Sequence, residues 1–299
     1  MADALLLLPD FLLIAAGWAV CRFTPLDRSV WDGVERLVYY LLFPLLLFGA
    51  IVRHPLQAAV LPLAGSGIAV VAAGVVAAYA LARWPGVDAR LHASGAQTAF
   101  RFNTYVALAL AERIAGTQGL AWMALIVSLC VPLSNVAAVW PLARQGGQGF
   151  GRELLRNPLI LATGAGLLAN LLGLRLPEMA ATAIGRIGGA ALPLGLMAVG
   201  AGLRLGALRE GPGLAIGLLA IRHALLPAVA LALVIGLALP PAQQAIVVAF
   251  AALPAAPSAY VLAARMGGNG AYVAGLVTVS TLVAMAALPA ALLLLRALA

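Results

Sequence analysis

The sequence predicts an all-α membrane protein in which ten transmembrane helices form two inverted repeats of five. Three observations lead to this fold class. Hydrophobic residues make up 64% of the 299 residues and charged residues only 9%, whereas a soluble domain carries about 25% charged residues. The chain also divides into ten apolar runs, and roughly 20 apolar residues are enough to cross a bilayer. Finally, features of the first five runs recur in the last five at a nearly constant offset.

The first half of the chain, residues 1–150, holds five of these runs, separated by short loops, most of which contain arginine. The runs cover residues 4–20, 34–52, 57–82, 92–115 and 119–143. We expect each run to form one transmembrane helix. The fourth run is interrupted by polar residues near Asn103, and a polar loop at residues 144–157 leads into the second half.

The second half, residues 151–299, holds the other five runs. They cover residues 158–174, 179–203, 212–239, 242–266 and 271–295. The fourth run of this half is interrupted at Pro254 and Pro257. Two prolines three residues apart remove two backbone donors and break a helix. The fourth span of each half is therefore the one that we expect to be broken.

Short motifs recur between the halves in the same order. Pro44 in span 2 matches Pro193 in span 7 at an offset of 149, and Phe100 in span 4 matches Phe250 in span 9 at an offset of 150. A unit with an odd number of spans must insert the second time with opposite polarity. The halves are therefore predicted to be inverted repeats, an arrangement typical of secondary transporters.

The basic residues predict the orientation in the membrane. All 18 are arginines. Ten lie in the loops on one side of the predicted bilayer and four on the other. Because cytoplasmic loops carry the excess of basic residues, we expect both termini on the non-cytoplasmic side of the cell inner (plasma) membrane. Arginines spread over loops do not form a nucleic-acid groove, so the expected partner is the lipid bilayer and not nucleic acid.

The two interrupted spans predict a binding site at mid-membrane. Backbone groups freed by a break must face protein or a wet cavity, and half-helices present positive N-termini that suit an anion such as a carboxylate. Asn103 can supply donors and acceptors at the first break, as can Ser258 and Tyr260 at the second. Prolines in transmembrane helices also occur as simple kinks, which is the alternative interpretation.

Four other polar residues within predicted spans each have two interpretations. Arg101 could attract an anion or cap a half-helix. Arg222 and His223 in span 8 could form an anion-attracting or proton-linked site, or the arginine could pair with helix carbonyls or reach an interface. Asn135 could support the site or simply join helices. Glu35, at the start of span 2, is expected at the headgroup level or paired with an arginine.

Metal and cofactor chemistry is not indicated. The three histidines are scattered and the two cysteines form no Cys-x-x-Cys or Cys/His cluster, so we expect neither a metal site nor a cofactor. His223 has no nucleophile partner in the sequence, so we expect no enzymatic activity. A membrane enzyme or a non-transporting receptor remains the least favoured alternative.

Four stretches resemble the auxin efflux carrier family, in particular its bacterial permease branch. They are residues 37–44 (LVYYLLFP), 102–106 (FNTYV), 254–260 (PAAPSAY) and 266–268 (MGG). The resemblance covers essentially the whole chain. It implies a fold similar to that of bile acid:sodium symporters and sodium/proton antiporters. In that fold spans 1, 2, 6 and 7 form a scaffold, and spans 3–5 and 8–10 form a moving transport domain.

The resemblance also implies a site and a function. Spans 4 and 9 would cross at mid-membrane, with Asn103 binding a substrate carboxylate and Pro44 facing it from the scaffold. The residues expected to line the site are Asn103, Thr104, Tyr105, Pro254, Pro257, Ser258, Tyr260 and Pro44. The protein would carry a small organic anion, a carboxylate such as malate, malonate or an auxin-like acid, by elevator-type alternating access. Spans 2 and 7 would form a homodimer contact.

The coupling ion is left open by the sequence. Plant members carry charged residues in span 3, and residues 57–82 here contain none. A sodium/proton antiporter or sodium-coupled symporter of the same fold is the alternative function. Cation exchange requires carboxylates near the midplane, whereas all ten acidic residues lie near predicted span ends or in loops.

Overall fold

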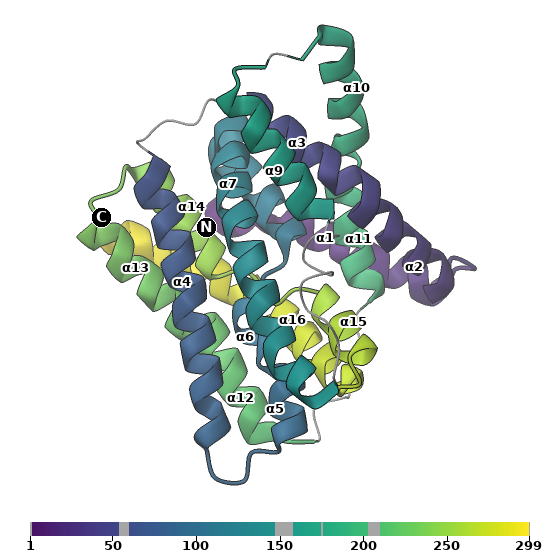
Figure 1. Ribbon diagram of the computed structural model, residues 1–299, viewed down its shortest axis with the longest axis vertical. Helices are drawn as coiled ribbons and strands as arrows, with labels where there is room; N and C mark the ends of the chain where they lie inside the picture. The colour runs from purple at the N-terminus through teal and green to yellow at the C-terminus, as the bar shows by residue number, and fades with distance from the viewer. Residues whose placement is uncertain (1, 54–59, 147–157, 175, 203–209, 299) are drawn as a thin grey trace.

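The computed structural model describes residues 2–53, 60–146, 158–174, 176–202 and 210–298. Within these ranges the regular structure is helical and no strand is formed (Figure 1). By length and composition, five helical stretches could cross a membrane, and two shorter helices are also apolar. The long stretches are Leu61–Arg83, Thr104–Leu142, Glu178–Ala201, Pro212–Gly236 and Gly270–Leu298, and the shorter helices are Leu12–Phe23 and Pro241–Ala251. The predicted all-α membrane class is thereby confirmed.

The first half begins with α1 (Ala2–Phe23). After a short loop, α2 (Arg28–Leu37), the π-helical turn η1 (Val38–Leu42) and α3 (Phe43–Arg53) follow one another directly. The carboxylate of Asp27 begins α2 by accepting the backbone N–H of Ser29 at 2.9 Å, which is the usual role of Asp at a helix N-cap. The next long helix, α4 (Leu61–Ala80), ends in the 3₁₀ turn η3 (Leu81–Arg83).

The fourth and fifth apolar runs form three helices. The first two, α5 (Ala89–Gly95) and α6 (Gln97–Phe100), end at the predicted interruption, and α7 (Thr104–Gly146) follows it. The backbone of α7 is non-helical at Ala115 and Gly116, where Gly116 has φ +56°. A methyl group added at Gly119 would lie 3.1 Å from the carbonyl carbon of Ala111. The chain therefore doubles back within α7, so this element contains two helical segments.

The second half is also helical where the structure describes it. It contains α9 (Pro158–Leu171), α10 (Glu178–Gly189), α11 (Ala191–Ala201), α12 (Pro212–Ala220), η4 (Ile221–Leu225), α13 (Leu226–Gly236), α14 (Pro241–Ala251), α15 (Ser258–Arg265) and α16 (Gly270–Leu298). Every predicted apolar run thus holds a helix. That all ten cross the bilayer, and that the halves are inverted, remain predictions.

One group of helices consists of α1, α3, α9, α10 and α11 (Figure 1). Helix α1 crosses α11 so closely that Gly17 touches the backbone of Met197 and Gly200 touches that of Ile14. Close approach of backbones through small residues is a common way to pack helices in membranes. These helices belong to the predicted spans 1, 2, 6 and 7.

A second group contains α4, α7, α13, α14 and α16. Gly74 of α4 lies against the side chains of Phe100 and Leu226. The largest fully buried side chains in and beside this group include Phe100, Phe250, Tyr272 and Arg222. Both helix breaks adjoin this group, because α7 begins after the first and α14 ends before the second.

Candidate functional site

The two helix breaks meet and are joined through their backbones. Phe102, between α6 and α7, pairs with Ala255, between α14 and α15, as a short antiparallel bridge. The N–H of Asn103 donates to the carbonyl of Pro254 at 2.9 Å, and the N–H of Ala256 donates to the carbonyl of Arg101 at 3.1 Å. Some of the backbone groups freed by each break are therefore satisfied by the other break, as a site within a membrane requires.

Asn103 is completely buried and begins the second half-helix. Its Oδ1 accepts the backbone N–H groups of Tyr105 at 3.0 Å and Val106 at 3.3 Å, so its acceptor is used as an N-cap. Its Nδ2 is buried and has no hydrogen-bond partner among the described residues. The asparagine thus has a donor left for a ligand.

Arg101 bridges the two broken helices with its side chain. Nη1 donates to Oε1 of Gln97 at 2.8 Å, and Nη2 donates to Oγ of Ser258 at 3.1 Å. The Arg101 side chain is partly exposed, as are its neighbours Thr104 and Pro257. The arginine therefore lies at the end of α6, beside the start of α15.

Tyr105 meets the helices of the first group. Its ring centroid lies 4.4 Å from that of Phe43, the residue before Pro44. A methyl group added at Gly195 of α11 would lie 2.8 Å from Cγ of Tyr105. Tyr105 of α7 thus contacts α3 at the residue before Pro44 and α11 at Gly195.

Arg222 contacts the second break directly, and His223 is linked to it through Ser280. The buried guanidinium of Arg222 donates from Nε to the carbonyl of Leu253 at 2.6 Å and from Nη2 to that of Phe250 at 3.3 Å. Of the two interpretations of Arg222, pairing with helix carbonyls is the one observed. His223 Nε2 lies 2.8 Å from Oγ of Ser280, which accepts the N–H of Ala255 at 2.8 Å.

Two further predicted residues, Tyr260 and Asn135, make no side-chain hydrogen bond to either break among the described residues. The hydroxyl of Tyr260 accepts a hydrogen bond from Nη2 of Arg28 at 2.7 Å, and Arg28 also pairs with Asp32 at 3.0 Å and Glu35 at 2.7 Å. The expected pairing of Glu35 with an arginine is confirmed. No hydrogen bond joins Asn135 to either break within the part of the chain that the structure describes.

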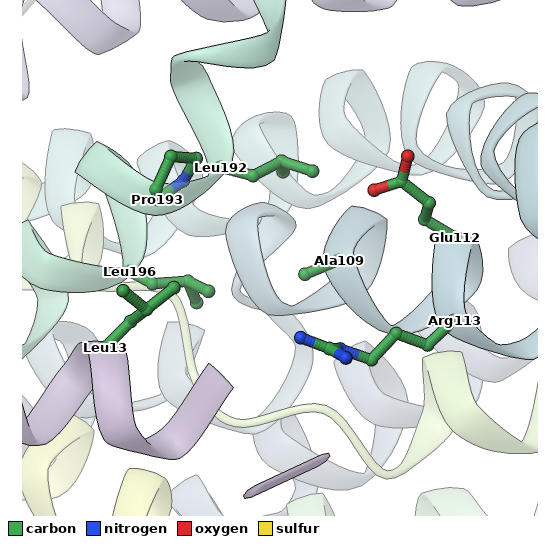
Figure 2. Close-up of a pocket in the computed structure, with 7 residues that line it drawn as sticks. All are labelled: Leu13, Ala109, Glu112, Arg113, Leu192, Pro193 and Leu196. Carbon is green, nitrogen blue, oxygen red and sulfur yellow. The ribbon is translucent and has the colours of Figure 1, made fainter. Parts of the chain in front are cut away.

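A cavity of about 380 Å³ lies between α1, α11 and the first segment of α7 (Figure 2). Leu13, Leu192, Pro193 and Leu196 form an apolar side, and Glu112 and Arg113 lie across from it. Its lining residues are Leu13, Ala109, Glu112, Arg113, Leu192, Pro193 and Leu196. No pattern in the sequence predicts this cavity, although Pro193 is the repeat partner of Pro44.

These features define a multi-pass helical membrane protein with two broken helices joined at their interruptions. The membrane transport protein family matches residues 141–292, which is just over half of the chain. The chain therefore belongs to this family, the auxin efflux carrier family, and the resemblance found in the sequence is confirmed. A comparison with curated proteins found no match.

Proposed function

We propose that this membrane transporter carries small organic anions, carboxylates such as malate, malonate or an auxin-like acid. Ten spans in two inverted repeats would provide a scaffold from spans 1, 2, 6 and 7 and a transport domain from spans 3–5 and 8–10. The observation that carries this proposal is the joined pair of breaks, because both spans are interrupted where they meet. Asn103, with its unused buried donor, lies at this junction.

Electrostatics at the four half-helix ends support an anion as the substrate. Helices α6 and α14 end at the breaks with negative C-termini, whereas α7 and α15 begin there with positive N-termini. Arg101 follows the last residue of α6, and Arg222 binds carbonyls at the end of α14. A cation thus offsets each negative end. No described acidic side chain is hydrogen-bonded to either break, although the carboxylate of Glu35 interacts electrostatically with Tyr105 and Tyr260 in the first turns of α7 and α15. The positive ends would attract a carboxylate substrate.

Within this site, Nδ2 of Asn103 would donate to the carboxylate. Arg101, which is partly exposed, and Ser258, which is exposed, would contribute further donors. Thr104, Tyr105, Pro254 and Pro257 would shape the walls. Pro44 would face the substrate from the scaffold, and Tyr260 would act through its contact with Arg28 and not as a ligand.

Movement of the transport domain against the scaffold would give alternating access. The cavity at Leu192 and Arg113 supports such a path, because it lies between helices of the two groups (Figure 2). We further propose that the protein lies in the inner membrane with both termini on the non-cytoplasmic side. Spans 2 and 7 would supply a homodimer contact.

Uptake into proteoliposomes tests the proposal with Asn103→Asp as the decisive variant. Aspartate is as good an N-cap as asparagine, so α7 should remain capped. The change replaces the free donor with a negative acceptor. We expect uptake of labelled malate, malonate and indole-3-acetate by the wild type. Asn103→Asp should lose at least about tenfold in apparent affinity, because a hydrogen bond to a charged group contributes about 1.5–3 kcal/mol.

The matched control is Thr117→Ala, an exposed position at the bend of α7, which should transport like the wild type. Ligand-induced thermal stabilisation gives a second readout, since a bound ligand raises the melting temperature. Wild-type uptake by Asn103→Asp, or a wild-type protein that transports and binds none of the three acids, would overturn the proposal.

A further inference from the structure

We propose that Ser280 and His223 are positioning residues of the substrate site, which hold the break of span 9 through a chain of neutral hydrogen bonds. This inference rests on the proposed function, because it concerns the geometry of the same site. Ser280, which belongs to no recognisable sequence motif, would thereby have a role at the site. The role of His223 would require no change of its charge.

The backbone direction at Ala255 explains why a serine is needed there. In an antiparallel pair, the groups of successive residues point alternately toward and away from the partner strand. The carbonyl of Pro254 accepts from the N–H of Asn103, and the N–H of Ala256 donates to the carbonyl of Arg101. The N–H of Ala255 therefore points away from the first break, and the fully buried hydroxyl of Ser280 accepts it at 2.8 Å. Without that hydroxyl, a backbone donor would be buried and unpaired.

His223 completes the chain behind Ser280. Its Nε2 lies 2.8 Å from the serine oxygen. A serine hydroxyl has one donor and two acceptor positions, so it can accept from Ala255 and donate to Nε2, or accept from both. A neutral imidazole that carries its proton on Nε2 fits the second arrangement and leaves no proton on the buried Nδ1. The chain thus connects α16 and the π-helical turn η4 to the bridge between the breaks.

A positively charged His223 fits these surroundings poorly. Nδ1 is buried and has no partner among the described residues, and the imidazolium would carry a proton on that nitrogen. Arg222 is its immediate neighbour. Helices in contact with η4 include α4, α6, α12, α13 and α16, which contain no acidic residue. Their other titratable or charged groups are Tyr79, Tyr272 and Arg296. His223 is therefore a neutral hydrogen-bonding partner and not a proton carrier.

The experiment compares four variants in the full-length protein. Ser280→Ala removes the acceptor, and His223→Leu removes the residue behind it. His223→Gln offers an uncharged amide at a similar reach. The matched control is Thr281→Val, because the neighbouring buried hydroxyl of Thr281 donates only to Val277 of its own helix in the contacts seen here.

We expect Ser280→Ala and His223→Leu to raise the half-saturating carboxylate concentration about tenfold with little change in maximal rate. Thr281→Val and His223→Gln should stay within about twofold of the wild type. The dependence of uptake on pH, from about pH 5 to pH 8, should be the same for His223→Gln as for the wild type, since an uncharged histidine does not titrate there.

Hydrogen exchange of the empty protein supplies a readout that needs no substrate. The N–H of Ala255 should exchange at least about tenfold faster in Ser280→Ala and at the wild-type rate in Thr281→Val. Unchanged exchange and affinity in Ser280→Ala would overturn the positioning role. A pH dependence that His223→Gln abolishes would overturn the neutral chain. If only the proposed function is wrong, the result differs: the N–H of Ala255 would still exchange faster in Ser280→Ala, but the wild type would transport no carboxylate.

Discussion

Replacing Gly17 or Gly200 with alanine should destabilise the crossing of α1 and α11. The nearest atoms to an added methyl group are the carbonyl oxygens of Met197 and Ile14, respectively. The methyl at Gly17 would also lie 2.6 Å from Cα of Met197, and the methyl at Gly200 would lie 2.7 Å from the carbonyl carbon of Ile14. Non-bonded carbon atoms prefer about 3.5–4.0 Å. The helices must therefore separate by about 1 Å, since no side-chain rotation can relieve a clash with backbone.

The magnitude follows from two opposing effects. Overpacking costs about 1–3 kcal/mol, and contact with backbone on both sides favours the upper end. The higher helix propensity of alanine offsets up to about 1 kcal/mol of this loss of stability. The net loss is about 2 kcal/mol, which corresponds to a decrease in melting temperature of about 4–8 °C, at about 2–4 °C per kcal/mol.

Thermal unfolding of the detergent-purified protein, followed by gel filtration of the surviving fraction, measures this change. The control is Gly164→Ala in α9, where an added methyl group meets no atom within 4 Å. This variant should melt at or slightly above the wild-type temperature. If Gly17→Ala and Gly200→Ala both melt as high as Gly164→Ala, the close approach of α1 and α11 is wrong.

Three further predictions concern single contacts. Tyr260→Phe removes the hydrogen bond from Arg28 but leaves the ion pair of Arg28 with Glu35. We expect a severalfold change in maximal uptake rate with unchanged ligand affinity, measured by thermal shift. A loss of ligand affinity would contradict this. Gly195→Ala should displace the ring of Tyr105, which also packs against Phe43. We expect uptake to fall at least about tenfold. Normal uptake would show that the ring has room to move. Hydrogen bonds from the Ser29 hydroxyl and the Val30 N–H lower the pKa of Asp27 below its ordinary value of 3.8. The contribution of Asp27 to stability is therefore complete above pH 3.8 and lost as the pH falls through the lowered pKa. Asp27→Asn should reduce the difference in melting temperature between pH 5 and pH 3. The same difference in the variant and the wild type would contradict the prediction.

The positions of the helix breaks could be predicted because they depend on local chemistry. Pro254 and Pro257 lack backbone donors, and the helix ends before them at Ala251 and resumes at Ser258. Asn103 is a strong N-cap residue, and α7 begins directly after it. Both signals act over a few residues, so they are readable from one sequence without knowledge of tertiary contacts.

The two π-helical turns were not predicted, although their signal was present. Each ends two residues before a proline, η1 before Pro44 and η4 before Pro227. A proline cannot donate to the carbonyl four residues earlier. In both turns the residue before the proline instead bonds the carbonyl five residues back, as Phe43 does with Val38. Such turns are therefore one possible response to a proline within an apolar run, although Pro132 and Pro193 have none before them.

Contacts between distant residues could not be predicted from local patterns. Arg28 and Tyr260 are 232 positions apart, and Ala255 and Ser280 are 25 positions apart on different helices. Neither pair belongs to a motif with fixed spacing. Tertiary packing alone brings them together, so the bridge at Arg28 and the support at Ser280 emerge only from the structure.

The two arginines that the sequence grouped as candidates for anion attraction differ in what they can do. Arg222 is fully buried, and moving it toward a ligand would leave the carbonyls of Leu253 and Phe250 unpaired, at a cost of about 1–3 kcal/mol for each group. It can therefore act on an anion only through its fixed field. Arg101 is partly exposed and bonds Gln97 and Ser258 through side chains that can reorient. Of the two, Arg101 is therefore the one that would contact the proposed carboxylate, while Arg222 would keep the neighbouring helix end from repelling it.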